Sequence, residues 1–381
     1  MLYTTDMNRW LAATLLLSFL FLALFSVIFG KKIRSFDPPL SITPTPSQSA
    51  APSPEITQEQ SQLSVVATDL QVPWGLAFLP DGSMLFTERP GRVRFIDVNH
   101  NLISEPIMTF SDVNATGEGG LLGVAVDPQF VSNKFVYFYY SYGYGASDMH
   151  NRVVRFVFDG KHLTDQKIIV DGIPGNSNHD GGRIKFGPDG NLYITTGDSE
   201  APSLAQNTTS LAGKILRVVG EKAEVYSYGH RNPQGLAWDD RGKLWATEHG
   251  RSAPTGYDEL NRIEQGKNYG WPTIQGDEKK EGMVTPVINS GPTTTWAPSG
   301  AAFYRGSIFF GGLKGQALFE AVLSGDGVSS LKKHFEGQLG RIRDVVLGPD
   351  NMLYITTSNR DGRGTPQEKD DKIYRVNPQK L

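Results

Sequence analysis

One alternation of apolar and polar positions recurs along the chain from Phe78 onward. Each copy places an apolar residue before a polar turn of Gly, Asp or Asn, and an alternating apolar strand follows. The clear copies are FLPDGSMLFTE from Phe78, FGPDGNLYITTGD from Phe186, WDDRGKLWATEHG from Trp238 and LGPDNMLYITTSN from Leu347. Two weaker copies are VDPQFVSNKFVYFYY from Val126 and FYRGSIFFGG from Phe303. Because Asp-Gly turns between short β-rich runs are typical of hairpins, the pattern predicts six similar hairpins.

The spacing of these copies predicts an all-β fold, a six-bladed β-propeller. Successive copies begin 44 to 65 residues apart, and a unit of that length holds four short strands with their loops. The alternative is a β-sandwich with chance similarity among its turns, but irregular sandwiches rarely repeat one phrase so often. In a propeller the loops of all blades converge around the central channel, and we expect the functional groups there.

The N-terminal part follows a different pattern. Trp10 to Phe29 contains no charged residue, and a helix of that length spans about 30 Å, the thickness of a bilayer core. We expect a transmembrane helix within residues 1–34, as an anchor rather than a cleaved signal segment, because the small-x-small cleavage pattern is missing near its end. Residues 35–62 are rich in Pro, Ser, Thr and Gln and predict a disordered linker. The propeller is then expected over residues 63–381.

Composition excludes several functions. The 381 residues include 37 Lys and Arg against 40 Asp and Glu, a net charge of −3, and no Cys. A near-neutral chain has no global basic field for nucleic acid, so we expect no nucleic-acid partner. Without cysteine there are no disulfides, thiolate metal sites or cysteine nucleophile.

The third repeat offers a candidate base. The segment NSNHDGGR places His179 beside Gly181 and Gly182, and glycines let a backbone run close to a ligand. A histidine beside an aspartate is more often a turn-stabilising pair. Asp198, however, follows nineteen residues later at the end of a predicted strand, where an acid can hold His179 in one tautomer and favour its protonated form.

The fourth repeat concentrates polar groups. We expect the HRNPQ segment to be a loop outside the core, because Pro233 interrupts pairing and its polar side chains need partners. Arg231 offers a planar fork of donors suited to a quinone or carboxylate oxygen, and Asn232 and Gln234 can both donate and accept. The oxygen-rich run over residues 250–259 is a candidate Ca²⁺ site. The alternative is a solvated loop in which Arg231 pairs with a nearby acid.

Taken in order, these motifs resemble a known enzyme family. They are PWGLAFLPDG, GEGGLLGVAVDPQF, NHDGGR, Gly197-Asp198, GHRNPQGLAW, DELN with NYGWP, APSGAAFY and RIRDV. Their order is similar to that of the soluble glucose/sorbosone dehydrogenases that depend on pyrroloquinoline quinone (PQQ). Because long inserted loops are absent, the chain is more similar to the aldose sugar dehydrogenase branch, which accepts several sugars.

The resemblance implies PQQ-dependent oxidation of an aldose at its anomeric C1 hydroxyl to the lactone, with an external electron acceptor. His179 is then the base that takes the hydroxyl proton and Asp198 supports it. Arg231 is expected against the C5 carbonyl of the quinone, where charge develops. Asn232 and Gln234 are expected to contact the cofactor.

The resemblance also implies the groups that hold the cofactor and its metal ions. Lys314, Arg341 and Arg343 match the basic residues that neutralise the three PQQ carboxylates. One Ca²⁺ would be held by the carbonyls of Gly250 and Arg251, and a second by Glu259 and the carbonyl of Tyr269.

Three positions depart from the family pattern. Glu118 stands where relatives often have glutamine near the cofactor, which adds a negative charge unless it is protonated or turned to an arginine. Arg251 stands where the glucose enzymes have proline. Trp296 lies in the fifth unit, where aromatic residues form the sugar wall in relatives.

Two other functions and the orientation remain open at this stage. A Ca²⁺-dependent propeller lactonase needs carboxylates in the channel but no basic cluster, and a non-catalytic binding propeller needs neither His179 nor Arg231. Lys31, Lys32 and Arg34 follow the predicted span, and a positive-inside count would place the propeller in the cytoplasm. Because enzymes of this family work outside the cytoplasmic membrane, we expect it on the extracytoplasmic side.

Overall fold

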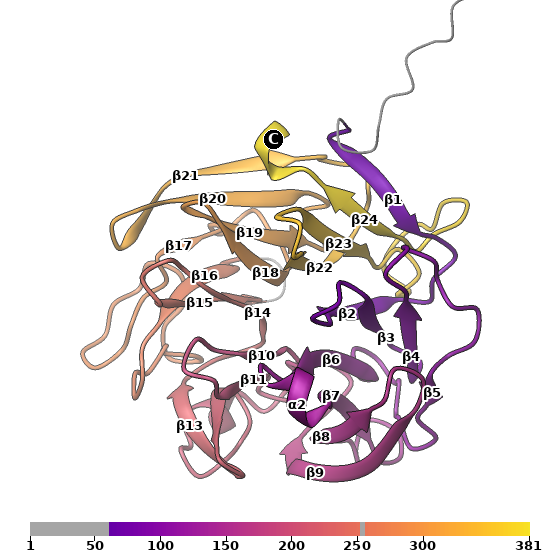
Figure 1. Cartoon of the computed structure of the whole chain (residues 1–381). Coiled ribbons are helices and arrows are strands. Elements are labelled where there is room, and N and C mark those ends of the chain that lie inside the picture. The colour runs from indigo at the N-terminus through magenta and orange to yellow at the C-terminus, as the bar shows by residue number, and fades with distance from the viewer. Residues whose placement is uncertain (1–60, 252–255) are drawn as a thin grey trace, which may run out of the picture. The chain divides into compact units, whose positions relative to one another are not determined.

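Six antiparallel four-stranded sheets form a ring in the computed structural model, which describes residues 61–251 and 256–381 (Figure 1). Each sheet runs outward from its innermost strand. The first three sheets are β2 (Pro73–Phe78), β3 (Met84–Glu88), β4 (Arg92–Ile96) and β5 (Met108–Thr109); β6 (Leu121–Val126), β7 (Phe135–Tyr142), β8 (His150–Phe158) and β9 (Leu163–Pro174); and β10 (Ile184–Phe186), β11 (Leu192–Thr196), β12 (Lys214–Val219) and β13 (Lys222–Tyr228). The predicted six-bladed β-propeller is confirmed.

The remaining sheets complete the ring. They are β14 (Pro233–Trp238), β15 (Leu244–Glu248), β16 (Glu259–Ile263) and β17 (Ile288–Asn289); β18 (Pro298–Tyr304), β19 (Ser307–Gly312), β20 (Leu318–Ser324) and β21 (Gly327–His334); and β22 (Ile342–Leu347), β23 (Leu353–Thr357), β24 (Ile373–Val376) and β1 (Leu63–Ala67). In the last sheet β1 pairs with β24, Leu63 opposite Val376, so the two ends of the described chain close the ring. Short helical turns are α2 (Phe130–Asn133), η2 (Pro202–Ala205) and η3 (Pro378–Lys380).

Every copy of the repeated phrase lies at the same place, the turn from an innermost strand to the second strand of its sheet. Local side-chain bonds fix these turns. Asp81 Oδ1 accepts the N–H of Ser83 at 2.9 Å, and Asp189 Oδ1 accepts that of Asn191 at 3.1 Å. In the weak fifth copy a short turn at Arg305 and Gly306, both with positive φ, replaces the aspartate. The repeated phrase therefore reflects the residues that this turn requires.

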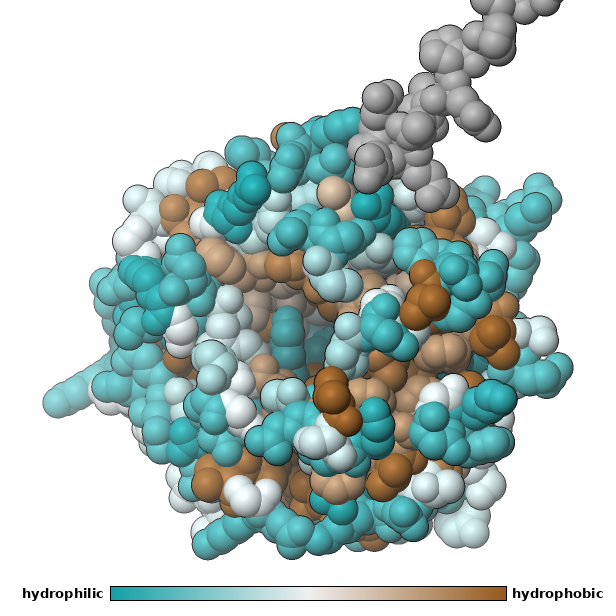
Figure 2. Space-filling model, in the orientation of Figure 1, coloured by the Kyte–Doolittle hydropathy of each residue, from teal (hydrophilic) through white to brown (hydrophobic). Residues whose placement is uncertain are grey.

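The core lies between neighbouring blades. Buried apolar side chains of the described residues form six clusters, and each joins at least two adjacent sheets. One cluster packs Leu85 and Val93 of the first sheet against Phe138 and Phe156 of the second. The innermost strands leave a hollow at the centre of the ring (Figure 2). Polar groups carried by the loops at its ends can therefore meet without crossing the core.

The predicted anchor over residues 1–34 lies outside the described residues, as do all but the last two residues of the predicted linker. Within residues 61–251 and 256–381, no helix is long and apolar enough to cross a bilayer.

Candidate active site

A pocket of about 800 Å³ lies where loops from several blades converge at one end of the channel. Many of the residues predicted from the sequence line it, although they come from five different blades. These are Glu118, His179, Asp198, Arg231, Gly250, Arg251, Lys314 and Arg341. The volume lies within the range of small-molecule sites. His179 and Arg231 therefore share one pocket, as the predicted chemistry requires.

His179 and Asp198 form a close pair in this pocket. The Nδ1 atom of His179 lies 2.7 Å from Oδ1 of Asp198, whose carboxylate is completely buried. His179 has a φ of 64°, and its loop presses against the next one, because a Cβ on Gly197 would lie 1.7 Å from the carbonyl oxygen of His179. Only glycine at 197 permits this contact. The Nε2 edge of the imidazole is thus left for a ligand.

Trp271 forms a hydrogen bond with the Asp198 of this pair, and the sequence analysis did not identify it. Its indole Nε1 donates to Oδ2 of Asp198 at 2.8 Å, and the Arg231 guanidinium lies 5.4 Å from the centre of its ring. It also lines the pocket. Trp296 is not an aromatic wall for a sugar. It is 5% exposed and packs in the core with ring centres 5.8 Å from those of Phe310 and Phe319. Trp271 belongs to the NYGWP motif, so that motif could have pointed to the aromatic residue of the pocket.

The HRNPQ segment is part of the core, which corrects the prediction of an exposed loop. Pro233 and Gln234 begin the innermost strand β14, where a bulge after Pro233 removes the conflict with the ladder. His230 is fully buried, its Nδ1 lies 2.8 Å from Oε2 of Glu248, and its ring stacks on Tyr269. The segment tolerates burial because its polar groups find partners.

Arg231 points from this segment toward the pocket and is 7% exposed. Its backbone N–H donates to Glu248, and its Nη1 lies 3.5 Å from the carbonyl oxygen of His249. Burial lowers the pKa of Arg231, and the carboxylates of Asp198 and Glu118 oppose that effect. Because the starting value is so high, the guanidinium remains a cation.

Asn232 and Gln234 lie beneath the pocket rather than on its wall. The Oδ1 atom of Asn232 accepts the N–H of Gly181 at 3.1 Å and an Nε2 proton of Gln234 at 3.0 Å. Gln234 also donates to the carbonyl of Gly181 at 3.0 Å. Both side chains therefore support the loop that carries His179, and their contact with a cofactor stays a prediction.

The predicted basic residues meet a carboxylate that the sequence reasoning missed. Asp361 accepts from Nε and Nη2 of Arg341 at 2.9 and 2.7 Å and lies 3.7 Å from Nη2 of Arg343. Arg343 is buried below the pocket and donates to Gln234 at 3.3 Å. Lys314 lines the pocket, and no carboxylate of the described residues lies within ion-pair distance of it.

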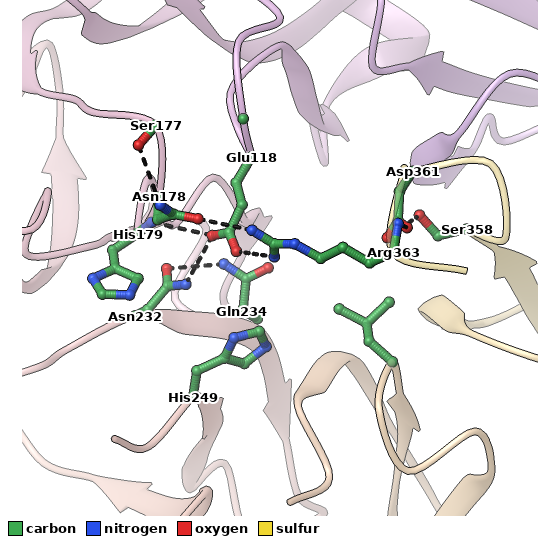
Figure 3. A network of polar contacts seen from close by, with 12 residues as sticks. Glu118, Ser177, Asn178, His179, Asn232, Gln234, His249, Ser358, Asp361 and Arg363 are labelled. Carbon is green, nitrogen blue, oxygen red and sulfur yellow. Dashed lines mark hydrogen bonds and ion pairs between the residues drawn. The ribbon is translucent and has the colours of Figure 1, made fainter. Parts of the chain in front are cut away.

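Glu118 faces an arginine, one of the two states expected for a carboxylate at this position. Its Oε1 pairs with Arg363 Nη1, and its Oε2 accepts the backbone N–H of His179 at 3.1 Å (Figure 3). Burial favours the protonated form of Glu118, but its interactions with His249 and Arg363 and the hydrogen bond from the backbone of His179 outweigh it and lower the pKa to about 2. Glu118 is therefore ionised at neutral pH.

The predicted metal residues gather around a small second cavity. Gly250, Arg251, Glu259 and Tyr269 all line a space of about 10 Å³, roughly the size of one water-sized group. Burial raises the pKa of Glu259, and the nearby charge of Glu248 adds to the shift. The described residues contain no cluster of three His, Asp or Glu side chains of the kind that binds metal alone. Any ion here would rely on carbonyl oxygens as well.

Comparisons with known proteins identify a family for this chain. The model of the Glucose / Sorbosone dehydrogenase family matches residues 70–366. Aldose sugar dehydrogenase YliI of Escherichia coli is 33% identical over an alignment 351 positions long, and the match covers 79% of this chain and 91% of that protein. The PQQ-bound form of aldose sugar dehydrogenase from Streptomyces coelicolor is 38% identical with a TM-score of 0.76, covering 82% and 97% of the two chains.

A more distant relative is quinoprotein glucose dehydrogenase B of Acinetobacter calcoaceticus. It is 30% identical over an alignment 281 positions long, and the match covers 63% of this chain and 57% of that protein. The family resemblance drawn from the ordered motifs is thus confirmed over nearly the whole propeller. The chain belongs to the glucose/sorbosone dehydrogenase family.

Proposed function

We propose that this protein is a PQQ-dependent sugar dehydrogenase that oxidises the anomeric C1 hydroxyl of an aldose to the lactone and passes the electrons to an external acceptor. The observation that carries the proposal is that the His179–Asp198 pair shares one pocket with Arg231, Lys314 and Arg341. A base opposite several cations is what a sugar and a tricarboxylate redox cofactor together require.

The pocket fits such a cofactor. Lys314 lacks a carboxylate partner among the described residues, and the buried Nε of Arg343 lacks a hydrogen-bond partner in the same part of the chain. These cations are suited to the carboxylates of PQQ, and Lys314 and Arg341 both line the pocket. PQQ, when bound, supplies the two-electron acceptor for the hydride that leaves C1.

The residues of this chain then have distinct tasks. His179 takes the C1 hydroxyl proton at Nε2, because its Nδ1 is held 2.7 Å from Asp198. Asp198 stabilises the imidazolium that forms and keeps the ring in one orientation. Arg231 supplies a fixed positive charge, and one well-placed donor of this kind lowers a barrier by about 3 kcal/mol. Proton and hydride leave the same carbinol, so the product is a lactone.

Calcium fits the second cavity. The carbonyls of Gly250 and Arg251 and the carboxylate of Glu259 with the carbonyl of Tyr269 would hold it, since Ca²⁺ prefers oxygen ligands of this mixed kind. The raised pKa of Glu259 supports this, because a buried carboxylate without a cation is held protonated. The ion would add positive charge beside Arg231, which lines both cavities.

The setting is part of the proposal. Residues 1–34 anchor the chain in the cell membrane, residues 35–62 form the linker, and residues 63–381 form the catalytic propeller on the extracytoplasmic side. The uncharged segment from Trp10 to Phe29 supports the anchor. Protease protection or reporter fusions test the orientation, and a cytoplasmic C-terminus would contradict it.

The test is sugar-dependent dye reduction by the full-length chain with added PQQ and Ca²⁺ over a panel of aldoses. H179A should abolish turnover while PQQ still binds. H162A is the matched control, because His162 pairs with Asp159 at 3.3 Å on the surface and is 73% exposed. Binding of PQQ without reduction of dye by any aldose would favour the non-catalytic propeller. Hydrolysis of lactones with Ca²⁺ alone would favour the lactonase.

A further inference from the structure

A chain of polar contacts crosses the pocket between distant blades (Figure 3). Arg363 lies in the loop between β23 and β24, Glu118 in the loop before β6, and Asn178 in the loop before β10. The Nη1 atom of Arg363 pairs with Oε1 of Glu118, and its Nη2 donates to Oδ1 of Asn178 at 2.8 Å. One side chain therefore links loops of three blades, and all three residues line the pocket.

The link ends on the main chain of the candidate base. The second oxygen of Glu118 accepts the N–H of His179 at 3.1 Å. His179 has a φ of 64°, a left-handed conformation that is unfavourable for a residue with a side chain and persists only when its surroundings hold it. The orientation of the imidazole follows from this backbone conformation. Glu118 is thus placed to hold that conformation in the absence of any ligand.

The same loop contacts the opposite side of the pocket. Asp361 stands two residues before Arg363 and binds Arg341, while its Oδ1 accepts the backbone N–H of Arg363 at 2.9 Å. A single short loop therefore joins the basic end of the pocket to the base.

Stability alone does not explain the Glu118–Arg363 pair. The Arg363 side chain is 52% exposed, and ion pairs with such exposure contribute little to folding. Its two guanidinium nitrogens nevertheless bind oxygens on different loops, which fixes the side chain across the pocket. Such an arrangement is suited to holding the His179 loop in position.

We propose that Glu118 and Arg363 form a clasp across the pocket that positions the backbone of His179, and with it the imidazole, for proton removal. The inference rests on the proposed function, because it assigns both side chains as positioning residues for that base.

The first experiment is a double-mutant cycle with E118Q, R363Q and the double variant at saturating PQQ. Each single variant should lower kcat about tenfold, as expected for one charge-assisted hydrogen bond, with little change in KM for the sugar. The double variant should be no slower than the slower single. R363K should recover most of kcat. R241Q is the matched control, since Arg241 pairs with Asp326 at 3.2 Å and is 43% exposed.

The second experiment reads the clasp without catalysis. Labelling with ¹⁵N-histidine gives seven backbone amide signals in the cofactor-free full-length chain, and H179Q assigns that of His179. E118A and R363Q should move this signal, and R241Q should leave it in place. An unmoved signal, multiplicative losses of kcat, or an effect of R363Q on PQQ affinity alone would overturn the clasp. If the wild type oxidises no aldose, the proposed function fails, while the amide signal still tests the clasp.

Discussion

Replacing Asp198 with asparagine tests the base most sharply, because both oxygens of this carboxylate face hydrogen-bond donors and the new amide nitrogen would be a further donor among them. Its Oδ1 faces His179 and also accepts the N–H of Glu200 at 3.0 Å, while its Oδ2 accepts Trp271 at 2.8 Å. If the new amide nitrogen faces the indole, two donors oppose each other. If it faces the imidazole, it opposes the N–H of Glu200 and favours the tautomer whose Nε2 carries a proton and cannot accept one.

The size of the effect follows from burial. Removing one partner of a buried ion pair costs about 3 to 5 kcal/mol, and the carboxylate of Asp198 is completely buried. If that loss falls on the imidazolium that forms during proton removal, D198N should lower kcat by about 10²- to 10⁴-fold at 1.36 kcal/mol per decade. Stopped-flow dye reduction at saturating sugar and PQQ measures it.

A second change sharpens the test. W271F removes the indole donor, so the asparagine amide nitrogen can face the phenyl ring while its oxygen faces His179. The double variant D198N/W271F should therefore be faster than D198N, although W271F alone is slower than the wild type. A D198N enzyme within about threefold of wild-type kcat would refute the assignment of His179 as the base, since a positioned base loses at least tenfold with its carboxylate.

Three further predictions concern stability. K214M should lower the free energy of unfolding by about 3 kcal/mol, because it strands the carbonyls of Leu204, Ala205 and Ala212, which Lys214 Nζ now binds at 2.9, 3.0 and 2.5 Å. Burial raises the pKa of Asp180 to about 7, so the wild type should lose about 2 kcal/mol relative to D180N as pH rises from 5 to 7. Calcium at a hundredfold excess over Kd should stabilise the wild type by about 3 kcal/mol and E259Q by far less.

Urea denaturation monitored by tryptophan fluorescence checks all three. For Asp180 the sign follows from linkage: the unfolded carboxyl releases its proton near pH 4, whereas the folded one keeps it until about 7, so rising pH favours unfolding in that window. Parallel pH curves for wild type and D180N would contradict this. Equal stabilisation of wild type and E259Q by calcium would remove Glu259 from the metal site. An unchanged free energy of unfolding in K214M would show that the three carbonyls find other partners.

The sequence by itself determined the blades and most of the candidate chemistry. The turns repeat because Asp-Gly hairpin geometry depends on residues only a few positions apart, such as Asp81 and Ser83. The His179–Asp198 pair was also within reach, since only nineteen residues and one hairpin of two strands separate its members. Ordered motifs brought Arg231, Lys314 and Arg341 into one hypothesis. Local spacing was sufficient for the turns and for the His179–Asp198 pair, whereas Lys314 and Arg341 came from the family resemblance.

Only the tertiary structure decided which groups complete the site. Trp271 is 73 residues from Asp198, and Arg363 is 245 residues from Glu118, so no local pattern relates them. The HRNPQ segment looked too polar for a core, yet its partner Glu248 lies on the neighbouring strand. A propeller brings the equivalent loops of all its blades together around one axis. The contacts across that axis form only when all six blades close the ring, so the sequence of a single repeat does not determine them.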